Sequence, residues 1–320
     1  MINRTGGVLC RAENAGTADN PVCTPSVSDR IPFSVTPDMV YTGNGSDEVL
    51  SFVFYAFFDS NEKLVCPEYS YSFYPVYCGF YDIPRDPVPL NADWSIDIEE
   101  MIARANKNHS ATIIANPNAP TALALTRNQI RYMIQHCPKD KAFVVDEAYV
   151  DFGGESAIPL LSEFDNLVVV RTFSKSLCGA GMRSGFIIAN PPMINAVTTV
   201  KNSLNHFPMD AVTQVAASAA CRNDWYYADC AKKVVAERDS FSAFLKELGW
   251  EVTDSKTNFI FTRKKGVDGK AVYEALKKDG ILVRRFDTAG IEEYLRITIG
   301  TKDQMKKLKE IFAKAVGAVK

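Results

Sequence analysis

Short, continuous runs of apolar residues alternate with longer amphipathic stretches from residue 63 onward. The short runs lie at 64–66, 112–115, 142–145, 167–170 and 185–189, and each ends at polar, Gly or Pro residues. Such runs are typical of strands that helices cover on both faces. The stretches at 96–107 and 126–136 have helical spacing, with Asp97 and Thr126 at plausible N-terminal caps. The pattern therefore predicts an α/β fold with a mostly parallel central sheet.

The pattern changes after Pro191. The segment 210–248 predicts two helices, and shorter elements follow it. These are strands at 258–262, 281–283 and 294–299, and helices at 268–279 and 302–319. We therefore expect a large domain at 35–225, a smaller α+β domain at 226–320, and an atypical, partly irregular segment at 1–34.

The longest apolar run, 49–58, is about half as long as a membrane-spanning helix, and it predicts a core helix. The first thirty residues lack the apolar region of a signal peptide. The chain has 36 basic and 38 acidic residues and a formal charge of −2, so nothing in its charge favours nucleic acid or an anionic membrane. We expect a small-molecule partner.

Cysteine and histidine usage argues against a metal centre. The eight cysteines form no C-x-x-C pair and the chain has 3 histidines, so neither a zinc site nor a disulfide framework is indicated. We expect reduced thiols, a cytoplasmic protein and no bound metal.

A lysine between two hydroxyl residues stands out in the segment RTFSKSLCGAGMRSG, which covers 171–185. Lys175 has the surroundings of an amine that attacks an aldehyde, because nearby positive charge helps an amine to stay neutral. Thr172, Ser174 and Arg183 are groups that would bind a phosphate beside it. A solvated loop lysine is the alternative interpretation, and for the tripeptide alone it is the more common one.

A second phosphate-binding feature precedes the apolar run at 49–58. The segment GNGSDE at 43–48 is a flexible turn that leads into a helix, so the backbone N–H groups of Ser46 and Asp47 would form an anion site. An ordinary capped helix start is the alternative.

Polar residues also follow two of the predicted strands. Asp146, in the segment DEAY, can accept a hydrogen bond from a protonated ring nitrogen, and Tyr149 can turn its hydroxyl toward the same ring. Asn118, in NPNAPT, lies in a turn that two prolines make rigid. Tyr71, in YSFYPV, is an aromatic residue that can stack on a ring. Turn capping for Asp146 and core packing for Tyr71 are the alternatives.

In this order, the motifs GNGSDE, YSFYPV, NPNAPT, DEAY and TFSKS-x4-GMRSG resemble the fold-type-I, pyridoxal-phosphate-dependent aminotransferases of class I and II, and within them the histidinol-phosphate aminotransferases. The resemblance extends from about Val35 to the C-terminus. It implies pyridoxal 5′-phosphate as the cofactor, a homodimer, and transamination between histidinol phosphate and 2-oxoglutarate.

The resemblance implies a role for each motif. Lys175 would bind the cofactor covalently and move the substrate proton, Asp146 would pair with the pyridine nitrogen, Tyr149 and Asn118 would contact the phenolic oxygen, and Tyr71 would stack on the ring. Ser46, Asp47, Thr172, Ser174 and Arg183 would bind the phosphate. In YLRITIGT, Arg296 would bind the substrate carboxylate, and in ILVRRF, Arg284 would meet a distal phosphate.

The chain departs from the family pattern at one position within the NPNAPT turn and at the position that follows it. Ala119 stands where many members have the Asn that contacts the ring oxygen, and Ala122 stands where they have Gly. The usual Asn-Glu-Asn-Pro segment is not recognisable before Val35. These departures predict slow turnover or altered substrate scope. A threonine-phosphate decarboxylase-like lyase, an aromatic aminotransferase and a cofactor-binding protein with little turnover are the alternative functions.

Overall fold

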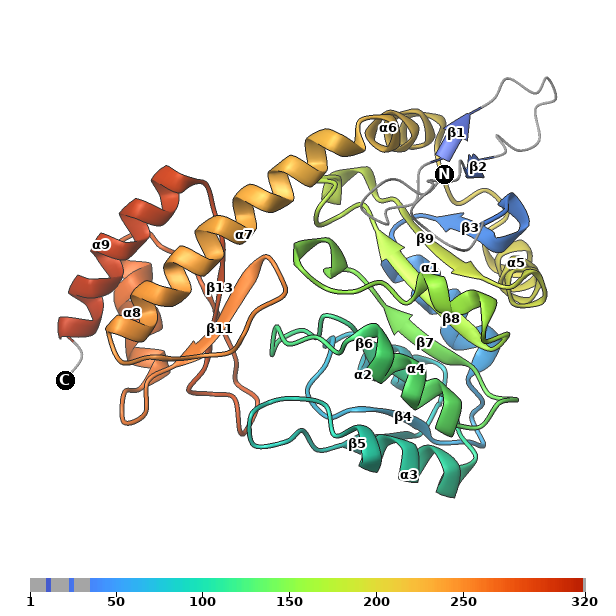
Figure 1. Ribbon diagram of the computed structural model, residues 1–320, viewed down its shortest axis with the longest axis horizontal. Helices are drawn as coiled ribbons and strands as arrows, with labels where there is room; N and C mark the ends of the chain where they lie inside the picture. The colour runs from blue at the N-terminus through green and yellow to red at the C-terminus, as the bar shows by residue number, and fades with distance from the viewer. Residues whose placement is uncertain (1–9, 13–22, 26–34, 319–320) are drawn as a thin grey trace.

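The computed structural model describes residues 10–12, 23–25 and 35–318. Figure 1 shows a large domain joined to a smaller one by the long helix α7 (Asp224–Glu247). The expectation for 1–34 falls mostly outside the described residues. Within that segment, β1 (Cys10–Ala12) and β2 (Cys23–Pro25) pair as antiparallel strands.

The large domain is built on a seven-stranded sheet. In spatial order its strands are β3 (Val40–Gly43), β9 (Gly185–Ala189), β8 (Leu167–Thr172), β7 (Phe143–Asp146), β6 (Thr112–Ala115), β4 (Leu64–Pro67) and β5 (Arg85–Val88). Strand β9 runs antiparallel to both of its neighbours, and the four pairs from β8 to β5 are parallel. This confirms the mostly parallel sheet, and all five apolar runs are strands.

Helices cover both faces of this sheet. One face packs against α1 (Ser46–Phe57), α2 (Tyr74–Phe80) and α5 (Pro191–Leu204), and the other against α3 (Ile98–Asn108), α4 (Arg127–His136) and α6 (Ala211–Arg222). Neighbouring strand residues face opposite ways: Ile113 belongs to the first core and Ile114 to the second. Complete burial of such a side chain contributes about 1.5–3 kcal/mol, which explains the continuous apolar runs.

The predicted helix starts are confirmed. The side chain of Asp97 accepts a hydrogen bond from the Glu100 N–H, and Thr126 forms a reciprocal capping box with Gln129. Residues 49–57 of the apolar run lie in α1, which begins at Ser46 and has a buried apolar face, and Phe58 caps its C-terminus. Short 3₁₀ turns lie at Pro37–Met39, Val150–Phe152, Ile158–Ser162 and Ala180–Met182.

The small domain contains a four-stranded antiparallel sheet beside three helices. The strand order is β10 (Glu251–Val252), β11 (Phe259–Arg263), β13 (Leu295–Thr298) and β12 (Arg284–Arg285), and the helices are α7, α8 (Gly269–Lys278) and α9 (Lys302–Ala318). This is the expected α+β arrangement.

One predicted strand of this domain was wrong. Residues 281–283 form no strand, because the Ile281 N–H bonds back to the Leu276 carbonyl and closes the end of α8. Ile281 and Val283 pack against the small-domain core. The expected boundary after residue 225 coincides with the first turn of α7, and the domain limits stay a prediction.

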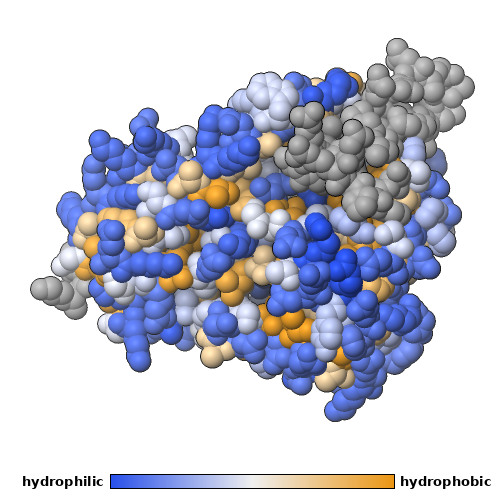
Figure 2. Space-filling view, viewed as in Figure 1, coloured by the Kyte–Doolittle hydropathy of each residue, from blue (hydrophilic) through white to orange (hydrophobic). Residues whose placement is uncertain are grey.

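The surface seen in Figure 2 is largely hydrophilic, and its hydrophobic patches are small and separate. Within the part of the chain that the structure describes, no helix is both long enough and apolar enough to span a membrane.

Candidate active site

The ends of several strands and one helix meet at a cavity of about 190 Å³ in the large domain. The residues that line it are Ser46, Asp47, Tyr71, Ala115, Pro117, Ala119, Asp146, Ala148, Tyr149, Ser174, Lys175, Ala180 and Arg183. The ends of parallel strands are the usual ligand sites of open α/β sheets. Most of the side chains predicted for the cofactor therefore lie around one cavity.

Lys175 lies in the loop between β8 and β9. Its Nζ atom is 5.2 Å from the centre of the Tyr149 ring. The loop is held by its own hydrogen bonds: the Ser174 N–H donates to Thr172 Oγ1 at 3.1 Å, and the Cys178 N–H donates to the Lys175 carbonyl at 3.0 Å. Thr172 therefore shapes the loop and does not line the 190 Å³ cavity.

Asp146 ends strand β7, and its carboxylate is buried. Oδ2 accepts a hydrogen bond from the Tyr74 hydroxyl at 2.9 Å, and Oδ1 accepts one from the Ala148 N–H at 3.1 Å. Burial raises the pKa of Asp146 to about 6, although these hydrogen bonds and the charge of Lys175 oppose the rise. Because an ionised carboxylate is costly to bury, a cationic partner would stabilise the charged form of Asp146.

Tyr74 is a residue of this site that the sequence interpretation missed. It lies at the start of α2 and is 1% exposed, and its only role from sequence was as part of an aromatic cluster. Its hydroxyl reaches Asp146 across 72 positions of the chain. The spacing of the segment YSFYPV contains no signal for that contact.

The N-terminus of α1 forms the other end of the cavity. Gly45 precedes it with φ of 91°, and a Cβ atom at Gly185 would lie 2.4 Å from the Ser46 backbone nitrogen. The close approach of β9 to α1 therefore requires glycine at 185. Arg183 Nη2 lies 3.2 Å from Asp47 Oδ2, which brings a cation to the N–H groups of the helix start.

Tyr71 lies between the two ends of the cavity. Its hydroxyl donates to Asp47 Oδ1 at 2.9 Å, and its ring meets that of Tyr74 edge to face, with the centroids 5.5 Å apart. Burial and the neighbouring Asp47 raise the pKa of Tyr71, so its hydroxyl stays protonated. The ring is thus fixed at the wall of the cavity, as a stacking role requires.

Asn118 does not line the cavity. Its side-chain amide donates to the Tyr69 carbonyl at 2.9 Å and to Thr121 Oγ1 at 3.1 Å, and its oxygen accepts from Ser70 at 2.9 Å. With these hydrogen bonds the Asn118 amide joins the turn to the segment at Tyr69 and Ser70. Ala119 lines the cavity instead, so the predicted contact of Asn118 with a ring oxygen has no support here.

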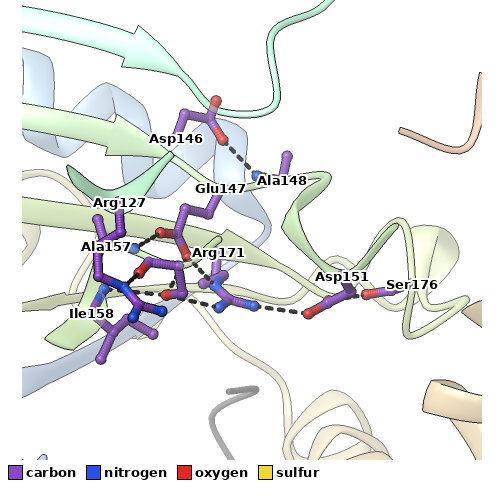
Figure 3. A network of polar contacts seen from close by, with 10 residues as sticks. Arg127, Asp146, Glu147, Ala148, Asp151, Ala157, Ile158, Arg171 and Ser176 are labelled. Carbon is purple, nitrogen blue, oxygen red and sulfur yellow. Dashed lines mark hydrogen bonds and ion pairs between the residues drawn. The ribbon is translucent and has the colours of Figure 1, made fainter. Parts of the chain in front are cut away.

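A buried polar network joins the two loops that hold Asp146 and Lys175 (Figure 3). The Arg171 guanidinium pairs with Glu147 at 2.8 Å and with Asp151 at 3.1 Å, and Asp151 accepts a hydrogen bond from Ser176. The side chains of Arg171 and Glu147 are 5% and 0% exposed. The network fixes the residue after Asp146 to the residue after Lys175.

The two predicted substrate arginines lie opposite each other on β12 and β13 of the small domain. The Arg296 guanidinium lies 4.9 Å from the Phe259 ring centre, and its Nε atom is buried without a hydrogen-bond partner among the described residues. Burial lowers the pKa of Arg296, and Arg284 adds to the effect. Arg284 is exposed, and its guanidinium lies 6.0 Å from the Phe286 ring centre. Neither arginine lines the 190 Å³ cavity.

A larger cavity of about 570 Å³ lies behind the Lys175 loop, between that loop and α7. Arg171, Thr172 and Ser176 line it, and Lys175 does not. It also lacks Asp146 and the start of α1, so we assign the chemistry to the smaller cavity. Among the residues that the structure describes, no cluster of three or more His, Cys, Asp and Glu side chains could hold a metal ion.

Comparisons with known proteins agree with this geometry. The family model described as aminotransferase class I and II matches residues 29–312. The chain is 46% identical over 279 residues to a histidinol-phosphate aminotransferase of Syntrophus aciditrophicus, covering 87% of this chain and 77% of that protein. It is 43% identical over 268 residues to the enzyme of the same name from Lactococcus lactis, covering 84% and 74%.

Two solved structures show the same fold. The histidinol-phosphate aminotransferase of Sinorhizobium meliloti, in complex with pyridoxal-5'-phosphate, superposes with a TM-score of 0.80 at 23% identity and covers 88% of this chain and 78% of that one. The L-threonine-O-3-phosphate decarboxylase of Porphyromonas gingivalis superposes with a TM-score of 0.74 at 23% identity, covering 88% and 84%.

Proposed function

We propose, since this chain belongs to the family of class I and II aminotransferases, that it transfers an amino group between glutamate and imidazole-acetol phosphate and so forms histidinol phosphate. The substrate assignment is supported by relatives of that name at 46% and 43% identity, each matched over more than four-fifths of this chain. The cofactor is pyridoxal 5′-phosphate.

The residues of the cavity fit this cofactor. The helix start at Ser46 and the Arg183 guanidinium suit a phosphate, and the buried Asp146 suits a protonated ring nitrogen. Lys175 lines the same cavity between these ends, within reach of the Tyr149 ring. Ser174 and Tyr71 complete the walls.

The bound cofactor supplies an electron sink for the substrate Cα. Lys175 Nζ would hold the cofactor and, as a free amine, would take the proton from the substrate Cα and deliver it to the cofactor carbon on the other side of the substrate nitrogen. Asp146, when ionised, would accept the hydrogen bond of the ring nitrogen and so favour the cationic ring. The Tyr149 hydroxyl would contact the ring oxygen, and the Ala119 side chain, which lines the same cavity, has no donor to add.

Arg296 binds the substrate carboxylate in this proposal. Its buried Nε has no hydrogen-bond partner among the described residues, and a carboxylate would satisfy it in a bidentate pair. Arg284, on the neighbouring strand, would meet the distal phosphate of histidinol phosphate.

The observation that carries the proposal is a lysine amine and a buried carboxylate in one cavity that ends at a helix N-terminus. The test is the glutamate half-reaction, followed by absorbance of the bound cofactor and by 2-oxoglutarate release. We expect conversion in the wild type and none in Lys175→Ala, with Lys201→Ala as a half-buried control on α5 that does not line the cavity.

A screen of acceptors then separates the alternatives. Turnover with imidazole-acetol phosphate supports the proposal, and preferred turnover with aromatic 2-oxo acids contradicts its substrate. Release of CO2 from a phosphorylated amino acid would indicate a lyase. Cofactor binding without 2-oxoglutarate would indicate a protein with little turnover.

We further infer a cytoplasmic homodimer. Free thiols at Cys66, Cys78, Cys137, Cys178 and Cys230 support a reducing compartment. A face on α1 and α2 exposes large apolar side chains, with Tyr55 58% and Phe80 77% exposed, and such a patch suits a second copy. Light scattering at micromolar concentration tests the dimer.

A further inference from the structure

Arg238 lies in the middle of α7, the helix that links the two domains (Figure 1). Its side chain is 5% exposed, although arginine is among the residues least often buried. Ala231, Phe241 and Leu245 share the buried face of the helix. A cation in this position calls for an explanation beyond packing.

The Arg238 guanidinium contacts both domains at once. Its Nη1 atom donates to the Phe152 carbonyl at 2.8 Å and to the Thr257 carbonyl at 3.1 Å. Phe152 belongs to the turn that follows Tyr149 in the large domain, and Thr257 lies two residues before the start of strand β11 of the small domain. One nitrogen therefore ties the loop of the cofactor cavity to the small-domain sheet.

The small-domain segment that Arg238 bonds leads into Phe259, whose ring packs against Arg296. Phe259, two residues after Thr257, packs edge to face on Tyr149 with the ring centroids 5.2 Å apart. The same ring lies 4.9 Å from the Arg296 guanidinium. Phe259 thus lies between a cavity residue and the predicted carboxylate-binding residue, and Arg238 bonds the chain two residues before it.

The electrostatic cost of burying the Arg238 guanidinium indicates that this residue does more than stabilise the fold. Among the residues that the structure describes, the one carboxylate paired with Arg238 is that of Asp239, whose side chain is 64% exposed, so the buried guanidinium relies mostly on neutral carbonyls. Burying a cation with such partners costs more than packing an apolar side chain of similar volume. Two further bonds cross the same interface, from Thr253 Oγ1 to the Thr121 carbonyl and from the Lys256 N–H to the Ala122 carbonyl, both at 2.8 Å.

We propose that Arg238 is a positioning residue that sets the distance between the cofactor cavity and Arg296, and so controls the binding of the substrate carboxylate without touching the substrate. The inference rests on the proposed function, because it takes Arg296 as the carboxylate site. Small displacements of a binding group cost on the order of tenfold to a hundredfold in rate or affinity, so the effect is measurable.

The test compares Arg238→Gln and Arg238→Lys with Lys233→Gln, an exposed control on the same helix. Each protein is loaded with pyridoxal 5′-phosphate and titrated with glutarate, a dicarboxylate without an amine, and KM and kcat for glutamate are measured. For Arg238→Gln we expect glutarate Kd and glutamate KM to rise on the order of tenfold or more, while cofactor affinity stays within about twofold. Arg238→Lys should recover part of the loss, since an ammonium donates to carbonyls.

The outcomes distinguish a failure of the Arg238 inference from a failure of the proposed function. Arg238→Gln that binds glutarate as tightly as the wild type, with a loss of thermal stability alone, overturns the inference. A wild type that binds no glutarate contradicts the proposed function, and the inference falls with it. If Arg238→Gln does not fold, Arg238→Lys decides: unchanged glutarate affinity in that variant also overturns the inference.

Discussion

Replacing Asp146 with Asn is expected to stabilise the cofactor-free protein while it disables the site. Burial raises the pKa of Asp146 from 3.8 to about 6 in the folded chain. The folded protein therefore holds this proton more tightly than the unfolded chain, and the free energy of unfolding falls as the pH rises between about 4 and 6. A buried carboxylate of this kind is typical of a functional site.

The size of the effect follows from the pKa difference. A pKa difference of about 2 corresponds to about 3 kcal/mol at neutral pH, where the buried carboxylate is ionised, and to about half of that at pH 5. Asparagine does not ionise, so the difference in unfolding free energy between variant and wild type should grow by about 1.5 kcal/mol between pH 5 and 7.5.

Urea unfolding of both cofactor-free proteins at the two pH values measures this difference. Asp229→Asn is the control, because that carboxylate is 55% exposed on α7. With cofactor bound, the Asp146→Asn glutamate half-reaction should slow on the order of 10²–10³-fold, because the ring nitrogen loses its anionic partner. If the difference in unfolding free energy between Asp146→Asn and the wild type stays constant with pH, the raised pKa of Asp146 is refuted.

Three further substitutions test other parts of the site. Tyr74→Phe removes a hydrogen bond that lowers the pKa of Asp146. The pH above which the free energy of unfolding no longer changes should therefore rise by about one to two pH units. An unchanged pH profile would show that the bond does not act on Asp146. Glu147→Gln breaks the buried ion pair with Arg171 and should lower the free energy of unfolding, measured in urea, by about 3–5 kcal/mol. Glu163→Gln, in a more exposed ion pair, should lower it by less than about 1 kcal/mol. Equal losses in the two variants would contradict a stabilising role for the buried network. Ala119→Asn adds an amide to the cavity wall and should tighten pyridoxal-phosphate binding about threefold to tenfold, measured by equilibrium titration, whereas weaker binding would mean that the wall has no room for it.

Strand-end chemistry was predictable from the sequence because the parallel sheet brings strand ends together. The apolar runs at 142–145 and 167–170 predicted β7 and β8, and the polar residues that follow them had to meet at one edge. The sequence alone therefore predicted that Asp146 and Lys175 lie near each other. Their joint position in one cavity follows from the parallel pairing of β7 with β8.

Contacts that depend on register or on helix placement were not predictable. Glu147 faces Arg171 because Asp146 pairs with Val170 across β7 and β8, and a shift of one residue would separate the two charges. The segment that forms α2 has a proline at its second position and no clear period, so Tyr74 could not be directed at Asp146. The same limit hid the contacts of Arg238, which join segments far apart in the chain.

The NPNAPT turn shows how a local motif can mislead. Asn118 has the right chemistry for a ring contact, but its amide makes one hydrogen bond within the turn, to Thr121, and two to the segment at Tyr69 and Ser70. Ala122 has φ of 66°, a left-handed conformation that favours glycine. A sequence pattern gives the residue types of a turn, whereas the direction of each side chain follows from backbone angles that the pattern does not contain.

Borohydride reduction followed by peptide mass spectrometry tests the central claim most directly, because reduction fixes the cofactor to the lysine that holds it. The account predicts that the pyridoxyl-phosphate label lies on Lys175, in the loop between β8 and β9. A label on another lysine, or no label on a protein that binds the cofactor, would contradict it.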